Sequence, residues 1–240
     1  MGYSWITVHR VRFAAPRNAK ETGAPDGPVH AKAWRFGPDS PLGEDGIRTG
    51  VSDIWGGVAF YDTRDAAQTV IGDPSAHLGF LDDTVEHWHA LAAVVAHRGD
   101  VDWSTADEPH PSLEPLPDDP GGVLAVVTTA GYDSKESAAP DRVRDFLKRV
   151  EDIIDWYGTL DANVVRALFN AVAAKEGMTF SVWKSDRDMM TSAYRGGMHS
   201  DYIKCNQDTP MFDHSSFTRL RLLDSKGSWG GIDPRAEAAA

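Results

Sequence analysis

His199 is the residue of this chain whose neighbours most favour a chemical role. A predicted strand and helix before it carry aromatic and methionine side chains and one arginine, namely Phe180, Trp183, Met189, Met190, Tyr194 and Arg195. A neutral imidazole beside an apolar cavity can ligate haem iron, and a nearby arginine could pair with a haem propionate or with bound oxygen. The same residue types are also ordinary core residues. Composition alone therefore favours packing and leaves the ligand role open.

Other histidines stand in weaker contexts. His87 and His89 are two residues apart, so they share a face only in a strand, and a metal site would need a third ligand that the sequence does not identify. A partly exposed edge segment is the simpler interpretation. His30 and His110 fall in expected loops, and His214 precedes the last expected strand.

Several classes of function lose support from motifs that are missing. The chain has no glycine-rich dinucleotide fingerprint, no phosphate-binding loop, no G-x-S-x-G and no H-E-x-x-H. Its single cysteine, Cys205, excludes an internal disulfide, a cysteine-based zinc site and an ordinary iron–sulfur cluster. Cys205 is expected near the end of a short helix, where the helix dipole disfavours a thiolate, so we expect an unreactive thiol.

Charge and hydropathy narrow the class of partner. A formal net charge of −12 argues against a nucleic-acid backbone or an anionic membrane surface as partner. No apolar run approaches the roughly 20 residues that span a bilayer, and the N-terminus reads as a strand instead of a signal peptide. We therefore expect a cytoplasmic protein with no membrane span.

The elements that must position His199 form two similar series. The first half predicts strands at 4–13 and 55–61, a helix at 64–71, and a buried strand or helix at 89–98. The second predicts strands at 121–130, 178–183 and 217–223, and helices at 141–160, 186–194 and 198–205. Residues 14–50 are rich in turn formers. The proline-rich acidic stretch 104–121 is the expected linker between domains 1–103 and 122–240.

A weak internal repeat relates the two halves. Residues 58–77 align with 180–199 with one gap, and both run from a strand to Arg-Asp at a helix start and end on a histidine, His77 or His199. This order predicts an α+β protein made of two tandem ferredoxin-like halves, whose sheets pack face to face or close into a barrel. Chance similarity between two amphipathic strand–helix pairs is the alternative.

The stretches 177–204 and 215–234 resemble the C-terminal part of the spheroidene monooxygenase family of carotenoid-modifying enzymes. In that family an FSLW strand, a helix containing AY, a histidine, an F-x-R strand and a final G-x-W-x-G-x-x-P recur in order. The matching positions here are 180–183, Ala193–Tyr194, His199, 217–219 and 227–234. The resemblance covers about a quarter of the chain.

The resemblance implies a haem-dependent monooxygenase on a dimeric α+β barrel fold. It implies haem b iron ligated by His199, with Arg195 and Tyr194 as catalytic cavity residues and Phe180, Trp183, Met190 and Arg195 beside the cofactor. Expected partners are a small or apolar organic substrate, dioxygen or peroxide, an electron-donor protein and a second copy in a homodimer. Residues 14–50 have no clear counterpart in the family, which leaves the substrate undetermined.

Three alternatives use the same scaffold. A haem-dependent dehydratase of a nitrogen–oxygen compound, as in aldoxime dehydratases, would need a distal acid–base residue, for which His77 and His214 are the candidates. A cofactor-free oxygenase would line its pocket with Trp, Tyr and His. A haem carrier or sensor would bind the cofactor without turnover.

Overall fold

The computed structural model describes residues 2–99, 112–132, 138–170, 176–195, 199, 201–202 and 212–240. The first half contains β1 (Trp5–Asn18), α1 (Ala19–Thr22), β2 (Ala33–Pro38), β3 (Val51–Tyr61), α2 (Arg64–Gly72), α3 (Pro74–His77), the 3₁₀ helix η1 (Gly79–Asp83) and β4 (Thr84–Gly99). The second contains β5 (Val123–Gly131), α4 (Pro140–Tyr157), β6 (Asn163–Asn170), β7 (Glu176–Trp183), α5 (Asp186–Tyr194), β8 (His214–Gly227) and α7 (Pro234–Ala239).

All eight strands join one sheet in the order β2-β3-β1-β4-β8-β5-β7-β6, and the pairings between neighbours are antiparallel. Within each half, the first strand lies between the third and the fourth, and the second strand lies at the edge, which is the ferredoxin-like order. The halves join through β4 and β8. The prediction of an α+β fold with two tandem ferredoxin-like halves is confirmed.

The sheet curls around a shared apolar core, and the two edge strands β2 and β6 lie against each other. Alternate residues of the strands point into this core, including Ile6, Val8, Phe60, Trp88, Val127, Phe169, Phe180, Val182 and Leu220. Strands from both halves contribute to this core. Of the two arrangements expected from the sequence, the sheets therefore close into a barrel and do not pack as two separate layers. The boundaries at 103 and 122 stay a prediction, since residues 100–111 lie outside the described part.

The structure corrects three expectations about the strands. The stretch 14–50 is less irregular than expected, because β1 continues to Asn18 past a register shift between Arg12 and Arg17, and β2 lies within it. Strand β6 was not predicted. The segment with His87 and His89 is not at an edge, because β4 pairs with both β1 and β8.

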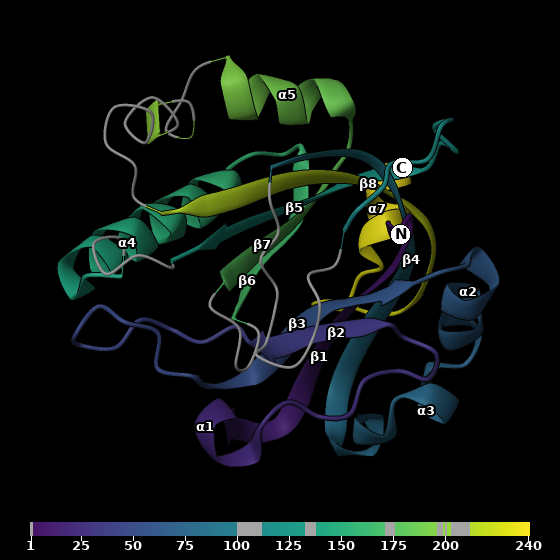
Figure 1. The fold of residues 1–240 in the computed structure, drawn as a ribbon, viewed down its shortest axis with the longest axis horizontal. Coiled ribbons are helices and arrows are strands. Elements are labelled where there is room, and N and C mark those ends of the chain that lie inside the picture. The colour runs from purple at the N-terminus through teal and green to yellow at the C-terminus, as the bar shows by residue number, and fades with distance from the viewer. Residues whose placement is uncertain are drawn as a thin grey trace.

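Each half has a helix that starts in the same way after its third strand. The hydroxyl of Thr63 accepts from the backbone N–H of Ala66 before α2, and that of Ser185 accepts from Asp188 before α5. Helices α4 and α5 lie over the strands of the second half, whereas α2 and α3 lie against the first half (Figure 1). No helix in the described ranges is long and apolar enough to cross a membrane.

Candidate active site

A cavity of about 570 Å³ lies between α4 and the outer face of the second half's sheet. Its roof is the apolar face of α4, formed by Val143, Phe146, Leu147, Val150, Ile153, Ile154 and Tyr157. Its floor is formed by outward-facing strand residues, including Val126, Thr128, Ala130, Leu168, Gly177, Thr179 and Ser181. Most floor side chains are small, which explains the space between helix and sheet.

Helix α4 is amphipathic, yet none of its residues is buried. An amphipathic helix normally buries its apolar face against a neighbouring element. In the first half α2 does so, since its Ala67, Val70 and Ile71 are fully buried against the sheet. The apolar face of α4 borders a cavity instead, so a ligand in the cavity would complete its packing.

His199 lines this cavity, and its ring is held in one orientation. Its Nδ1 lies 3.1 Å from the carbonyl oxygen of Ala193, which can only accept, so Nδ1 carries the proton and donates. The ring centroid also lies 6.0 Å from that of Tyr157. Burial lowers the pKa of His199, which favours the neutral ring with a lone pair on Nε2. This tautomer is the form that ligates a metal.

The structure supports a cavity position for Trp183 and Tyr194. Trp183 is buried, stands edge-on to Tyr157 at 4.9 Å between centroids, and donates from Nε1 to the hydroxyl of Ser181 at 2.9 Å. Tyr194 lines the cavity and is 39% exposed, which places it near the surface.

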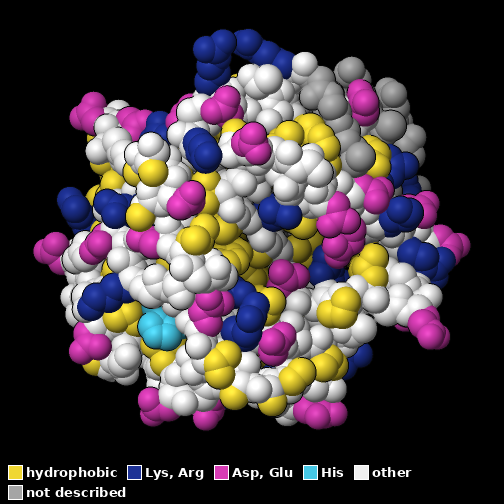
Figure 2. Space-filling model, turned by 180° about the vertical axis from the view of Figure 1, so that it is seen from behind, with side chains coloured by type: hydrophobic (Ala, Val, Ile, Leu, Met, Phe, Trp, Pro, Cys, Tyr) yellow, Lys and Arg dark blue, Asp and Glu magenta, His cyan; other side chains and the backbone are white. Residues whose placement is uncertain are grey.

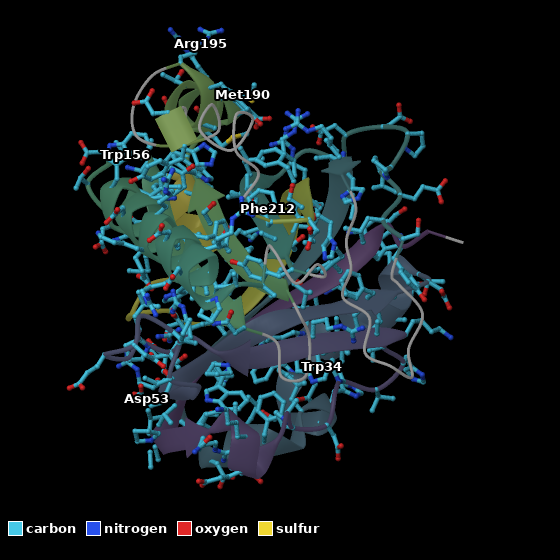
Figure 3. All side chains as sticks on the ribbon, turned by 60° about the vertical axis from the view of Figure 1, so that its left-hand side comes forward. Trp34, Asp53, Trp156, Met190, Arg195 and Phe212 are labelled. Carbon is cyan, nitrogen blue, oxygen red and sulfur yellow. The ribbon has the colours of Figure 1, made fainter. Side chains whose placement is uncertain are left out.

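Three other expected residues lie differently. Phe180 is among the residues that line the cavity, but its ring packs inside the barrel against Trp88 and Trp229, on the opposite face of β7. Met190 is 40% exposed and does not line the cavity, whereas its neighbour Met189 does. Arg195 stands exposed at the outer end of α5, away from the body of the protein (Figure 3).

Four other arginines line the cavity in place of Arg195: Arg48, Arg98, Arg149 and Arg166. Arg166 rises from β6 and donates from Nε to the carbonyl oxygen of Ile154 at 2.8 Å. Arg48 comes from the β2–β3 connection of the first half and pairs with Asp39 and with Glu151 of α4. No pattern in the sequence pointed to Arg48, because only the fold brings the β2–β3 connection to α4.

The two histidines expected as acid–base candidates do not line the cavity. His77 ends α3 in the first half, and His214 begins β8. Sequence reasoning also missed His9, whose Nδ1 lies 2.8 Å from Nδ1 of His89 in the interior of the first half. No group of three or more potential ligands suited to a metal ion is found among the residues that the structure describes.

The face of the protein opposite to the view in Figure 1 carries acidic and basic side chains interspersed, with no single-sign patch (Figure 2).

Comparisons with known proteins agree with this architecture. No family model matches the chain. Spheroidene monooxygenase from Rhodobacter capsulatus is 25% identical over 191 residues, which cover 76% of this chain and 72% of that protein. The resemblance to spheroidene monooxygenase is thereby confirmed.

Solved structures share the fold at low sequence identity. An aldoxime dehydratase in complex with butyraldoxime has a TM-score of 0.57 at 10% identity, with 97% of this chain and 85% of that chain covered. A candidate monooxygenase from Fusobacterium nucleatum has a TM-score of 0.41 at 12% identity, with 97% of both chains covered. The fold shared with the dehydratase and the strand order above agree on a dimeric α+β barrel type of fold.

Proposed function

We propose that this chain is a haem-dependent oxidoreductase of the monooxygenase type, with the haem in the cavity under α4 and His199 as the axial ligand. The observation that carries the proposal is the arrangement at His199, where the Ala193 carbonyl fixes the proton on Nδ1 and leaves the Nε2 lone pair for a metal. The similarity to spheroidene monooxygenase supports the reaction class.

The residues around the cavity fit a haem. The α4 face offers an apolar wall for a flat macrocycle, and Trp183 and Tyr157 flank the histidine. Arg166 lies among the lining residues and could pair with a propionate. Bound iron would supply the redox chemistry, and the protein would supply orientation, polarity and access.

The chain's own residues would keep the His199 ring neutral and oriented, and would exclude water from the cavity. Burial of His199 keeps its ring neutral, and the Ala193 carbonyl prevents it from turning. The apolar α4 face would exclude water from a small or apolar organic substrate. His77 and His214 do not line the cavity, so the dehydratase alternative has no identified acid–base residue.

The test is an absorption spectrum of the protein loaded with haem, for wild type, His199→Ala and His77→Ala. We expect a Soret band in wild type, a shifted or much weaker band in H199A because the axial ligand is lost, and no change in H77A. His77 is the matched control, since it is the counterpart of His199 in the repeat and lies outside the cavity.

A wild-type protein without a Soret band would remove the haem proposal. A band of unchanged shape and occupancy in H199A would remove His199 as the ligand. A haem-loaded protein that never consumes dioxygen or peroxide, with a reductant and candidate substrates present, would instead favour a carrier or sensor.

A further inference from the structure

Three hydrogen-bond donors that line the cavity have no acceptor among the described residues. They are the guanidinium Nε of Arg48, the phenol of Tyr132 and the side-chain amide nitrogen of Asn170, and all three atoms are buried. A buried donor without an acceptor destabilises the fold, so native proteins seldom keep one without a reason. Three in one cavity therefore point to an acceptor supplied by a ligand.

The three donors come from different elements and lie toward the same end of the cavity. Tyr132 directly follows β5, and Asn170 is the last residue of β6. Both strands pair antiparallel with β7, so they run parallel to each other and end at the same side of the sheet. Arg48 pairs with Asp39, which accepts from the backbone of Leu168, two residues before Asn170.

This end lies far from His199. The His199 ring contacts Tyr157, which contacts Trp183, and Trp183 pairs with Asn163 at the start of β6. Seven residues of extended strand separate Asn163 from Asn170, or about 20 Å at roughly 3.3 Å per residue. The cavity is therefore elongated, with the imidazole at one end and the three donors at the other.

The charge of the lining indicates which acceptor would bind. Four arginines line the cavity, and the described lining residues include no aspartate or glutamate, although acidic residues outnumber basic ones, 36 to 24, in the whole chain. Arg48 is only 9% exposed, and Asp39 and Glu151 pair with its guanidinium from outside the lining, so it offers a directed N–H while the other three arginines supply the positive charge of the lining. A cleft lined by one sign of charge attracts a ligand of the opposite sign.

We infer that Arg48, Tyr132 and Asn170 form a carboxylate-binding subsite at the end of the cavity remote from His199. The ligand class is an elongated apolar molecule with a carboxylate at one end. That carboxylate belongs to an organic acid that binds beside the haem, because the propionates of a haem held by His199 lie too close to the iron to reach this end. The inference rests on the proposed function only in taking this cavity as the ligand site.

The test compares acid and ester probes on wild type, Tyr132→Phe, Asn170→Ala and Arg48→Lys. Each variant removes one of the unpartnered donors, and Arg48→Lys keeps the positive charge. Tyr61→Phe is the matched control, because Tyr61 is a buried tyrosine of the first half that does not line the cavity. The probes are iron protoporphyrin IX and its dimethyl ester, and decanoate and methyl decanoate, the latter pair with both the empty and the haem-loaded protein.

We expect Y132F and N170A to weaken binding of decanoate about tenfold or more, and to leave methyl decanoate and the control unchanged. Selective loss for iron protoporphyrin IX alone would overturn the assignment, because it would place a propionate at this end. Selective loss for decanoate would assign it to an organic acid. Equal effects on acids and esters, or no effect in any of the three variants, would overturn the inference.

The outcomes also separate this inference from the haem proposal. A protein that binds neither porphyrin but binds decanoate in a Tyr132-dependent manner would remove the haem and keep the subsite. A protein that binds haem through His199, with no preference for acids over esters, would keep the haem proposal and remove the subsite.

Discussion

His9 and His89 face each other across β1 and β4 in the interior of the first half. Their Nδ1 atoms lie 2.8 Å apart, so one ring donates and the other accepts. The Nε2 of His9 also lies 2.6 Å from the hydroxyl of Thr7. Burial lowers the pKa of His9 to about 3 and the pKa of His89 well below its ordinary value of 6.5. Both rings are therefore neutral in the folded protein.

This pair predicts a loss of stability in mild acid. Below pH 6.5 the unfolded chain protonates both histidines and the folded protein does not, so stability falls as pH decreases and is flat above 6.5. The free energy of unfolding should drop by up to about 2 kcal/mol per histidine between pH 6.5 and 5. Urea unfolding at several pH values measures this dependence.

The variant with His9→Leu and His89→Leu supplies the comparison. Replacing both partners removes the hydrogen bond without leaving an unpaired nitrogen from the pair. Its free energy of unfolding should depend on pH much less than that of wild type. Equal slopes in the two proteins would mean that the pair does not carry the effect.

At the scale of residues, the sequence identified some of the side chains that line the cavity and missed others. His199 and Trp183 were identified and line the cavity. Met190 stays a prediction, but Met189 is the methionine of α5 that lines the cavity and is buried, whereas Met190 is exposed. Arg48 and Tyr132 could not be found, since their place in the cavity depends on contacts between distant segments.

At the scale of elements, α4 forms one wall of a cavity that a ligand would fill. Its apolar face is only partly buried, and it is fastened at few points: Arg48 to Glu151, Arg144 to the carbonyl of Asp45, and Arg166 to the carbonyl of Ile154. Elements with little buried apolar surface open more readily than core elements.

Loading the cavity with haem should therefore slow amide hydrogen exchange in α4. Residues 140–157 should gain protection because the ligand fills the space beneath them, and residues 64–72 of α2 should not change because α2 is already packed. Hydrogen exchange followed by mass spectrometry reads both helices in one experiment. Equal protection of both would indicate global stabilisation instead of a local effect.

The long elements and β7 followed from the sequence, and the two edge strands β2 and β6 did not. Periodicity over 18 residues revealed α4, and alternation revealed β1, β3 and β5. Strand β2 has only six residues and ends on Gly37 and Pro38, which resemble turn signals. Strand β6 alternates at Val165, Ala167 and Phe169 but follows a helix closely. Both are sheet edges, where pairing with a neighbour decides the outcome more than local preference.

At the scale of the whole molecule, the G-x-W-x-G-x-x-P segment at 227–234 packs against the barrel core. Trp229 contacts Trp88 and Phe180 with ring centroids 5.7 and 6.0 Å away, and the Arg10 guanidinium lies over its ring. Asp233 accepts from the Trp88 indole at 3.0 Å. Packing against the core therefore accounts for Trp229 and Asp233 in this segment.

Trp229→Ala should lower the free energy of unfolding by roughly 2–4 kcal/mol, because Trp229 is partly exposed and full burial gives 3–5. Denaturant unfolding measures the loss. The spectrum of the haem-loaded variant should match wild type, since Trp229 lies on the opposite side of β7 from the cavity. A shifted Soret band would instead connect the segment to the cofactor.

The fusion of both halves in one chain has a consequence for how each half can change. In a symmetric pair of identical halves, every substitution that opens a cavity on one side opens it on the other, and the cost in stability is doubled. Here the two helix-covered faces are encoded separately. One is packed solid behind α2, and the other is left open beneath α4. The first half can thus stay rigid while its Arg48 reaches the cavity of the second half. Residues of the second half can then change to suit a ligand without weakening the packing of the first.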